Sequence, residues 1–155
     1  MKKFLVSVVG GYECDTETAE LAERTGELIA NEGFVLVCGG RSGVMEAVCR
    51  GAKKAGGITV GILPGEDKRD ANEFVDIAIT SGLGYTRNAI VAGTADLVVA
   101  FPGKYGTLSE IGLALNAGKE VYGIGAWDIE GVIKLKSPEE LKDILDKKGK
   151  AKGVR

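Results

Sequence analysis

The chain has 155 residues, of which 45% are hydrophobic and 27% charged, a balance that suits a globular protein with a buried core. Its formal net charge of −2 provides no basic field for nucleic acid, and no apolar run reaches the length of a membrane span. There is no histidine, which excludes His-dependent triads, histidine general bases and histidine metal ligands.

Short apolar runs of β-forming residues alternate with helical patterns along the chain. The predicted strands cover residues 3–9, 34–38, 57–63, 74–80, 95–101 and 120–125. The predicted helices cover residues 15–31, 44–55, 82–94, 106–118 and 137–148, with Asp15 or Thr16 capping the first and Ser137 the last. A less regular segment follows Gly125, and the basic tail 149–155 is expected to be solvated.

Strands that are apolar throughout and separated by helices are typical of a parallel sheet covered on both faces. The pattern therefore predicts an α/β fold in one domain, residues 1–155: a doubly wound, Rossmann-like sheet, largely parallel, of six to seven strands. Cys14, Cys38 and Cys49 lack C-x-x-C spacing, which favours a reducing cytoplasm over a disulfide framework or a zinc site.

Glycine makes up 24 of the 155 residues, and three predicted strands end in glycine-rich turns. Ligands of doubly wound sheets bind beyond the carboxyl ends of the strands, where a helix N-terminus suits a phosphate or a carboxylate. One such turn alone is explained by a tight βα connection, whereas two glycine loops that open helices at one edge favour an anion site. The candidate anion-binding residues are Gly10, Gly11, Gly39, Gly40, Arg41, Ser42, Gly43, Pro102, Gly103, Lys104, Tyr105, Gly106 and Thr107.

Neither G-x-G-x-x-G nor G-x-x-x-x-G-K-[ST] occurs in the chain, which disfavours a standard NAD enzyme and a P-loop NTPase. Arg87 shares a helical stripe with Leu83, Ile90, Val91 and Thr94, so the stripe predicts a guanidinium that faces inward. An inward arginine needs a carboxylate or a phosphate. The alternatives to a ligand are a structural ion pair and an arginine side chain that extends to the sheet edge and keeps its charge in water.

Glu110 also has two interpretations. Thr107, Leu108, Ser109 and Glu110 have the spacing of a capping box, in which the glutamate reaches back to the start of the helix. The alternative is a site carboxylate beside the glycine turn.

Two segments carry a resemblance to a known family. "PGKYGTLSE" resembles the PGGxGTxxE signature of the LOG (Lonely Guy) family, long labelled lysine decarboxylase-like, and "GGRSGVMEAV" resembles its second glycine loop. Arg87 stands 15 residues before Pro102 and 23 before Glu110, as the arginine of that family does. The chain is most similar to the short prokaryotic branch that also resembles the molybdenum-cofactor carrier proteins.

The resemblance implies a cytoplasmic homodimer that binds a nucleoside 5′-monophosphate, cleaves its N-glycosidic bond and releases the base and ribose 5-phosphate. It assigns Arg87 and Glu110 to the catalytic positions and the glycine turns to the phosphate. A non-catalytic binder or carrier of a phosphorylated ligand, such as molybdenum cofactor, is the alternative. Two residues depart from the pattern: Lys104 stands at the second glycine of PGG, and Asn88 at the basic residue after the arginine. We expect no metal, no resident cofactor, no nucleic-acid partner and no decarboxylase activity.

Overall fold

Seven parallel strands form one sheet in the order β4-β3-β2-β1-β5-β6-β7. The computed structural model describes residues 2–153. The doubly wound α/β fold predicted from the sequence is therefore confirmed, since the strand order reverses direction at β1. The strands are β1 (Leu5–Val9), β2 (Val35–Cys38), β3 (Ile58–Leu63), β4 (Ile77–Thr80), β5 (Leu97–Ala100), β6 (Val121–Ile124) and β7 (Val132–Leu135).

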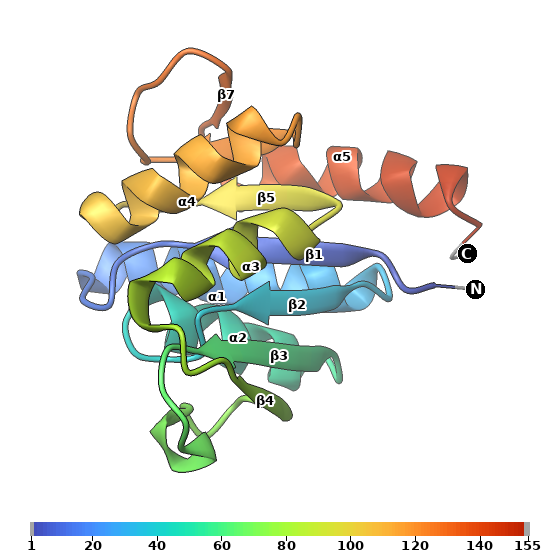
Figure 1. Cartoon of the computed structure of the whole chain (residues 1–155). Helices are drawn as coiled ribbons and strands as arrows, with labels where there is room; N and C mark the ends of the chain where they lie inside the picture. The colour runs from blue at the N-terminus through green and yellow to red at the C-terminus, as the bar shows by residue number, and fades with distance from the viewer. Residues whose placement is uncertain (1, 154–155) are drawn as a thin grey trace.

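Helices cover both faces of this sheet (Figure 1). Helices α1, α2 and α5 lie behind it in that view, and α3 and α4 lie in front, with the carboxyl ends of the strands on the left. The helices are α1 (Thr16–Asn31), α2 (Val44–Lys54), α3 (Asn88–Thr94), α4 (Tyr105–Asn116) and α5 (Pro138–Ala151), with short 3₁₀ turns η1 (Lys68–Asp70) and η2 (Gly84–Arg87).

The central strands are apolar throughout because each face of the sheet has its own core. Leu97 and Val99 belong to the cluster under α1, α2 and α5, whereas Val98 and Ala100 belong to the cluster under α3 and α4. Alternate side chains of one strand point to opposite faces, so both sets must be apolar.

The helix predicted over residues 82–94 is wrong in its first half. The chain forms the 3₁₀ turn η2 there, after Gly82 and at Gly84, both of which have positive φ, and α3 begins only at Asn88. Leu83, Ile90 and Thr94 are exposed, so they do not form the inward stripe that we predicted with Arg87 and Val91. The buried face of α3 consists of Asn88, Val91 and Ala92.

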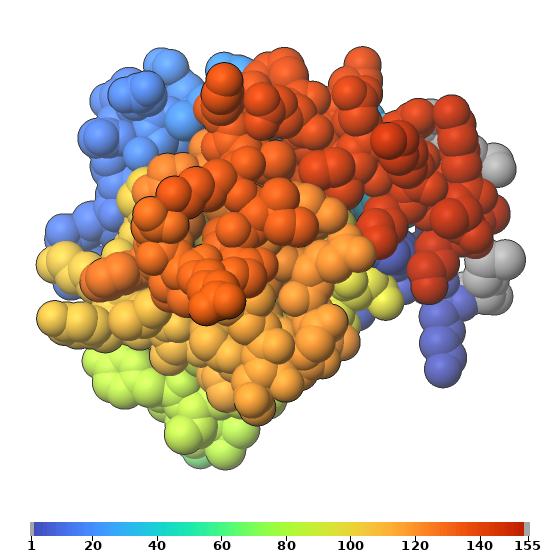
Figure 2. Space-filling model, turned by 90° about the horizontal axis from the view of Figure 1, so that it is seen from above, coloured from blue at the N-terminus to red at the C-terminus, as the bar shows by residue number. Residues whose placement is uncertain are grey.

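The segment after Gly125 contains a strand that the sequence did not predict. β7 pairs in parallel with β6, and its four residues are only partly buried, as suits the edge of a sheet. Seen from above, residues of α4, the segment around β7 and α5 form one surface over this end of the sheet (Figure 2). α5 continues to Ala151, past the predicted end, and residues 154–155 of the predicted solvated tail lie outside the described residues. Within residues 2–153, no helix has the length and apolar character that a membrane crossing needs.

Candidate functional site

A cavity of about 500 Å³ opens at the carboxyl ends of the central strands. It lies between the turns that follow β1, β2 and β5 and the short helix pair η2–α3. Nine of the residues predicted from the sequence line its wall: Gly10, Gly11, Arg41, Ser42, Arg87, Lys104, Gly106, Thr107 and Glu110.

The remaining predicted residues lie near the cavity without lining it: Gly39, Gly40, Gly43, Pro102, Gly103 and Tyr105. Several of these glycines serve close packing between the turns. A Cβ atom on Gly103 would overlap the Thr107 hydroxyl, and one on Gly43, where φ is +66°, would overlap the Gly11 carbonyl oxygen. The tight-turn interpretation therefore accounts for part of the glycine pattern.

Gly39 has a more direct connection to the site. A Cβ atom there would lie 2.9 Å from Nη2 of Arg87 and 2.7 Å from Sδ of Met45. Glycine at the end of β2 therefore lets the guanidinium lie against the backbone, and a larger residue would push Arg87 and Met45 aside.

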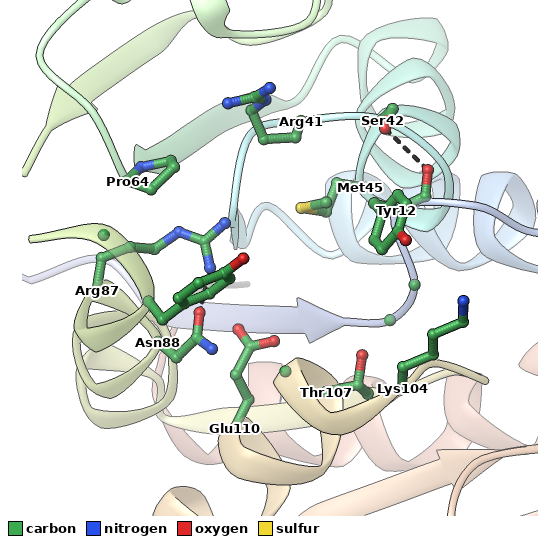
Figure 3. Close-up of a pocket in the computed structure, with 15 residues that line it drawn as sticks. Tyr12, Arg41, Ser42, Met45, Pro64, Arg87, Asn88, Lys104, Thr107 and Glu110 are labelled. Atoms are coloured by element: carbon green, nitrogen blue, oxygen red, sulfur yellow. Dashed lines mark hydrogen bonds between the residues drawn. The ribbon is translucent and has the colours of Figure 1, made fainter.

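Helix α4 begins at Tyr105, one residue before the predicted range, and its N-cap is Lys104, three residues before Thr107. Thr107 is therefore inside the first turn, and the predicted capping box does not form, because the Glu110 side chain turns into the cavity (Figure 3). The first amide groups of the helix have no helical acceptor and lie beside Gly106 and Thr107 on the cavity wall.

Glu110 and Arg87 face each other across one end of the cavity (Figure 3). Glu110 is only 7% exposed, and within residues 2–153 its carboxyl has neither a hydrogen bond nor a salt bridge. Burial raises the pKa of Glu110 to about 8, and the charge of Arg87 only partly offsets this effect. Burial likewise lowers the pKa of Arg87, and the Glu110 charge acts in the opposite direction.

Lys104 and Tyr12 mark the other end of the cavity (Figure 3). The Lys104 ammonium lies 5.8 Å from the centre of the Tyr12 ring, a cation–π contact. The backbone around these residues is fixed by two hydrogen bonds: Ser42 Oγ donates to the Tyr12 carbonyl at 2.8 Å, and Trp127 Nε1 donates to the Lys104 carbonyl at 3.4 Å. Lys104 thus adds a positive charge to the cavity wall, and the turn that follows β5 remains closely packed.

Sequence reasoning missed several wall residues: Tyr12, Met45, Pro64, Gly84, Tyr85 and Asn88. Most of them come from separate turns that only the fold brings together. Asn88 could have been found from the sequence, since it follows Arg87 directly and departs from the family pattern at that position. In the part of the chain that the structure describes, no group of three or more Cys, Asp or Glu side chains forms a metal site.

The strand order and the cation-lined cavity at the carboxyl ends of the strands define a doubly wound, Rossmann-like protein. The chain belongs to the SLOG cluster4 family, whose model matches residues 3–153. A protein of Archaeoglobus fulgidus is 46% identical over 142 residues, which cover 90% of this chain and 93% of that protein. The cytokinin riboside 5′-monophosphate phosphoribohydrolase of Mycobacterium tuberculosis is 35% identical over 98 residues, or 61% of this chain and 52% of that enzyme. The chain thus spans about half the length of that enzyme.

Solved structures extend the similarity to the whole chain. The molybdenum cofactor binding protein of Rippkaea orientalis is 38% identical, with a TM-score of 0.89 over 95% of this chain and 98% of that protein. The molybdenum cofactor carrier protein of Chlamydomonas reinhardtii is 32% identical, with a TM-score of 0.85 over 94% of this chain and 98% of its own. The resemblance that the sequence suggested, to the LOG family and to the carrier proteins, is confirmed.

Proposed function

We propose that the cavity binds a nucleoside 5′-monophosphate or a similar phosphorylated small molecule, and that Arg87 and Glu110 catalyse hydrolysis of its N-glycosidic bond. The observation that carries the proposal is the buried Glu110, whose carboxyl faces the cavity beside Arg87. In the described part of the chain, this carboxyl has no hydrogen-bond partner and Arg87 forms no salt bridge. A buried, unpartnered carboxyl is costly for the fold, so its placement here points to a ligand.

The phosphate would lie at the end of the cavity that holds Lys104, Thr107 and Gly11. The first turn of α4 offers amide donors and a partial positive charge there, and Lys104 adds a full charge. With the phosphate at this end, the sugar and base extend toward Arg87 and Glu110.

The reaction adds water across the bond between the sugar and the base. The bond electrons leave with the base, which takes a proton, and water attacks the sugar carbon to give ribose 5-phosphate. Positive charge develops on the sugar as the bond breaks, so an ionised Glu110 would stabilise it and orient the water. Arg87 would orient that carboxylate or contact the departing base. Because the pKa of Glu110 is about 8, we expect kcat/KM to rise with pH up to about 8.

Release of free base from a panel of nucleoside 5′-monophosphates, including AMP and a cytokinin riboside 5′-monophosphate, tests the proposal. Glu110→Gln and Arg87→Ala should each lower turnover by roughly a hundredfold or more, because each removes a charge that acts in the transition state. Glu130→Gln is the matched control, since it changes an exposed carboxylate outside the cavity. Full activity of Glu110→Gln would refute the catalytic assignment.

A second candidate function is a non-catalytic carrier of a phosphorylated ligand such as molybdenum cofactor. It is favoured by the similarity to the cofactor-binding and carrier proteins, which covers 95% and 94% of this chain, whereas the similarity to the phosphoribohydrolase covers 61% of it. The same incubation separates the two candidates. A carrier retains its bound nucleotide intact, whereas an enzyme releases base.

We also propose that the chain forms a homodimer. Ile77 and Ile79 on the edge strand β4 are 50% and 45% exposed, and burial against a second copy would remove them from water. Light scattering tests this directly, and a strict monomer would refute it.

A further inference from the structure

Asn88 is a buried amide at the junction between the two halves of the site. It follows Arg87 directly, begins α3 and is only 4% exposed. A buried amide with two donors and an acceptor needs partners for both kinds of group.

The Asn88 side chain has one partner on each side. Its Oδ1 atom accepts a hydrogen bond from Nη1 of Arg87, and its Nδ2 atom donates to Oγ of Ser109 at 3.1 Å. The Ser109 hydroxyl in turn donates to the Gly106 carbonyl at 2.6 Å. One chain of hydrogen bonds therefore connects the guanidinium to the first turn of α4, which forms the opposite wall.

The two Asn88 contacts have opposite polarity, and this selects an amide. An aspartate would accept from Arg87 but has nothing to donate to Ser109, and an alanine would do neither. An aspartate would also neutralise the guanidinium as a close ion pair. The amide oxygen anchors Arg87 and leaves its positive charge uncompensated.

The other groups around Arg87 are also consistent with an arginine that Asn88 anchors and whose positive charge stays available. Among residues 2–153, Glu110 is the carboxyl that lines the cavity with Arg87, and its burial favours the protonated form near neutral pH. In the same part of the chain, the buried Nε atom of Arg87 has no hydrogen-bond partner. Arg87 is thus held at one nitrogen by Asn88 and keeps hydrogen-bonding capacity and charge for a ligand.

We propose that Asn88 is a positioning residue, which orients Arg87 toward the cavity through a neutral hydrogen bond and so preserves the arginine charge for an anionic ligand. The inference rests on the proposed function for the ligand class, while the anchoring of Arg87 is a property of the free protein.

Two variants separate anchoring from charge. Asn88→Ala frees the guanidinium but leaves its charge, whereas Asn88→Asp retains an acceptor of nearly the same shape and adds a negative charge. If Asn88 served packing alone, the isosteric Asn88→Asp would be closer to the wild type. We expect the reverse: AMP binding, measured by calorimetry, falls about tenfold in Asn88→Ala and further in Asn88→Asp.

Adenosine is the matched ligand, because it lacks the phosphate. Its affinity should change less than that of AMP in Asn88→Asp. Equal losses for AMP and adenosine, or an Asn88→Asp protein that binds AMP like the wild type, would overturn the charge-preserving role.

Anchoring is measured without any ligand by ¹⁵N NMR of the arginine side chains, with Arg87→Lys to assign the signal. A pinned guanidinium gives separate, slowly exchanging Nη signals in the wild type, and we expect these to merge in Asn88→Ala. Unchanged Arg87 signals would refute the positioning role even if nucleotide binding failed, so the two failures are distinguishable.

Ser109→Ala provides the second variant in case Asn88→Ala does not fold. Ser109→Ala removes the hydrogen bond between Asn88 and Ser109 and leaves the one between Asn88 and Arg87. The loss of AMP affinity in Ser109→Ala should therefore be smaller than in Asn88→Asp. An equal or larger loss would assign the role to the serine hydroxyl and overturn the proposal.

Discussion

At the scale of single residues, Glu110 shows how one side chain serves the site at the expense of the fold. Its spacing from Thr107 suggested a helix cap, but α4 begins at Tyr105 and the carboxyl lies in the second turn, where it points into the cavity. Burial without a hydrogen bond raises its pKa to about 8, which means that the folded protein holds a proton that the unfolded chain releases at a lower pH.

This raised pKa predicts a pH-dependent stability difference for Glu110→Gln. Between about pH 4.5, the ordinary value, and about pH 8, the native protein retains the proton and the unfolded chain does not. The free energy of unfolding of the wild type therefore falls as pH rises through this window. Above about pH 8 Glu110 is ionised in both states, so its destabilising effect remains but no longer changes with pH. The amide cannot ionise, so Glu110→Gln should become more stable than the wild type by roughly 2–4 kcal/mol at pH 8.

Denaturant unfolding at pH 5 and pH 8 measures the difference. Glu130→Gln, at an exposed position, should show no such trend. A constant difference between Glu110→Gln and the wild type at both values would show that Glu110 does not titrate in this range.

At the scale of elements, two glycines set the contact between α1 and α2. A Cβ atom on Gly26 would overlap the Val48 carbonyl oxygen, and one on Gly51 would overlap the Glu23 carbonyl oxygen. The backbones of α1 and α2 are thus in close contact on one face of the sheet. Their packing holds the N-terminus of α2, and with it Arg41 and Ser42, against the cavity.

Substitution of these glycines should be costly although alanine is the better helix former. Gly51→Ala should destabilise the protein by roughly 3 kcal/mol or more, because the clash is with backbone atoms and the helices must separate. Gly93→Ala in α3 is the matched control: nothing lies within 4 Å of the added Cβ atom. We expect it to stabilise by about 0.5–1 kcal/mol through helix propensity.

Thermal or urea unfolding of both variants checks the contrast. Two equal changes in stability would mean that helix propensity, and not the close approach of α1 and α2, determines the effect.

At the scale of the whole molecule, the charge of the cavity opposes that of the protein. The chain carries a net charge of −2, whereas Arg41, Arg87 and Lys104 all line the cavity, and none of them forms a salt bridge within residues 2–153. Three uncompensated cations in one concave site focus a positive potential there. The fold therefore gathers positive charge in the cavity, although the net charge of the chain is negative.

This concentration predicts that phosphate stabilises the whole molecule. Binding to the folded state alone raises the apparent stability, by about 1.4 kcal/mol when the free ligand is at ten times its Kd. The melting temperature should therefore rise in phosphate relative to chloride at equal ionic strength. Lys104→Ala should reduce this rise, whereas Lys147→Ala, on α5 and away from the cavity, should leave it unchanged. Equal rises in all three proteins would place the phosphate elsewhere.

The architecture follows from the sequence alone, because strands such as 95–101 are apolar on both faces and only a covered parallel sheet buries both. The sequence also indicated which turns line the cavity, since glycine turns at the ends of parallel strands meet at one sheet edge. β7 was missed because a four-residue, half-exposed edge strand has neither a long apolar run nor a clear alternation.

The orientation of the cavity side chains depends on contacts that exist only in the folded chain. The predicted inward stripe with Arg87 does not exist; Arg87 reaches the cavity because Gly39 leaves room for it and Asn88 accepts its hydrogen bond. Glu110 takes no part in a capping box because the N-cap of α4 is Lys104, three residues before Thr107. Local spacing predicts where a side chain begins, but contacts between residues distant in sequence decide where it points and how its charge is balanced.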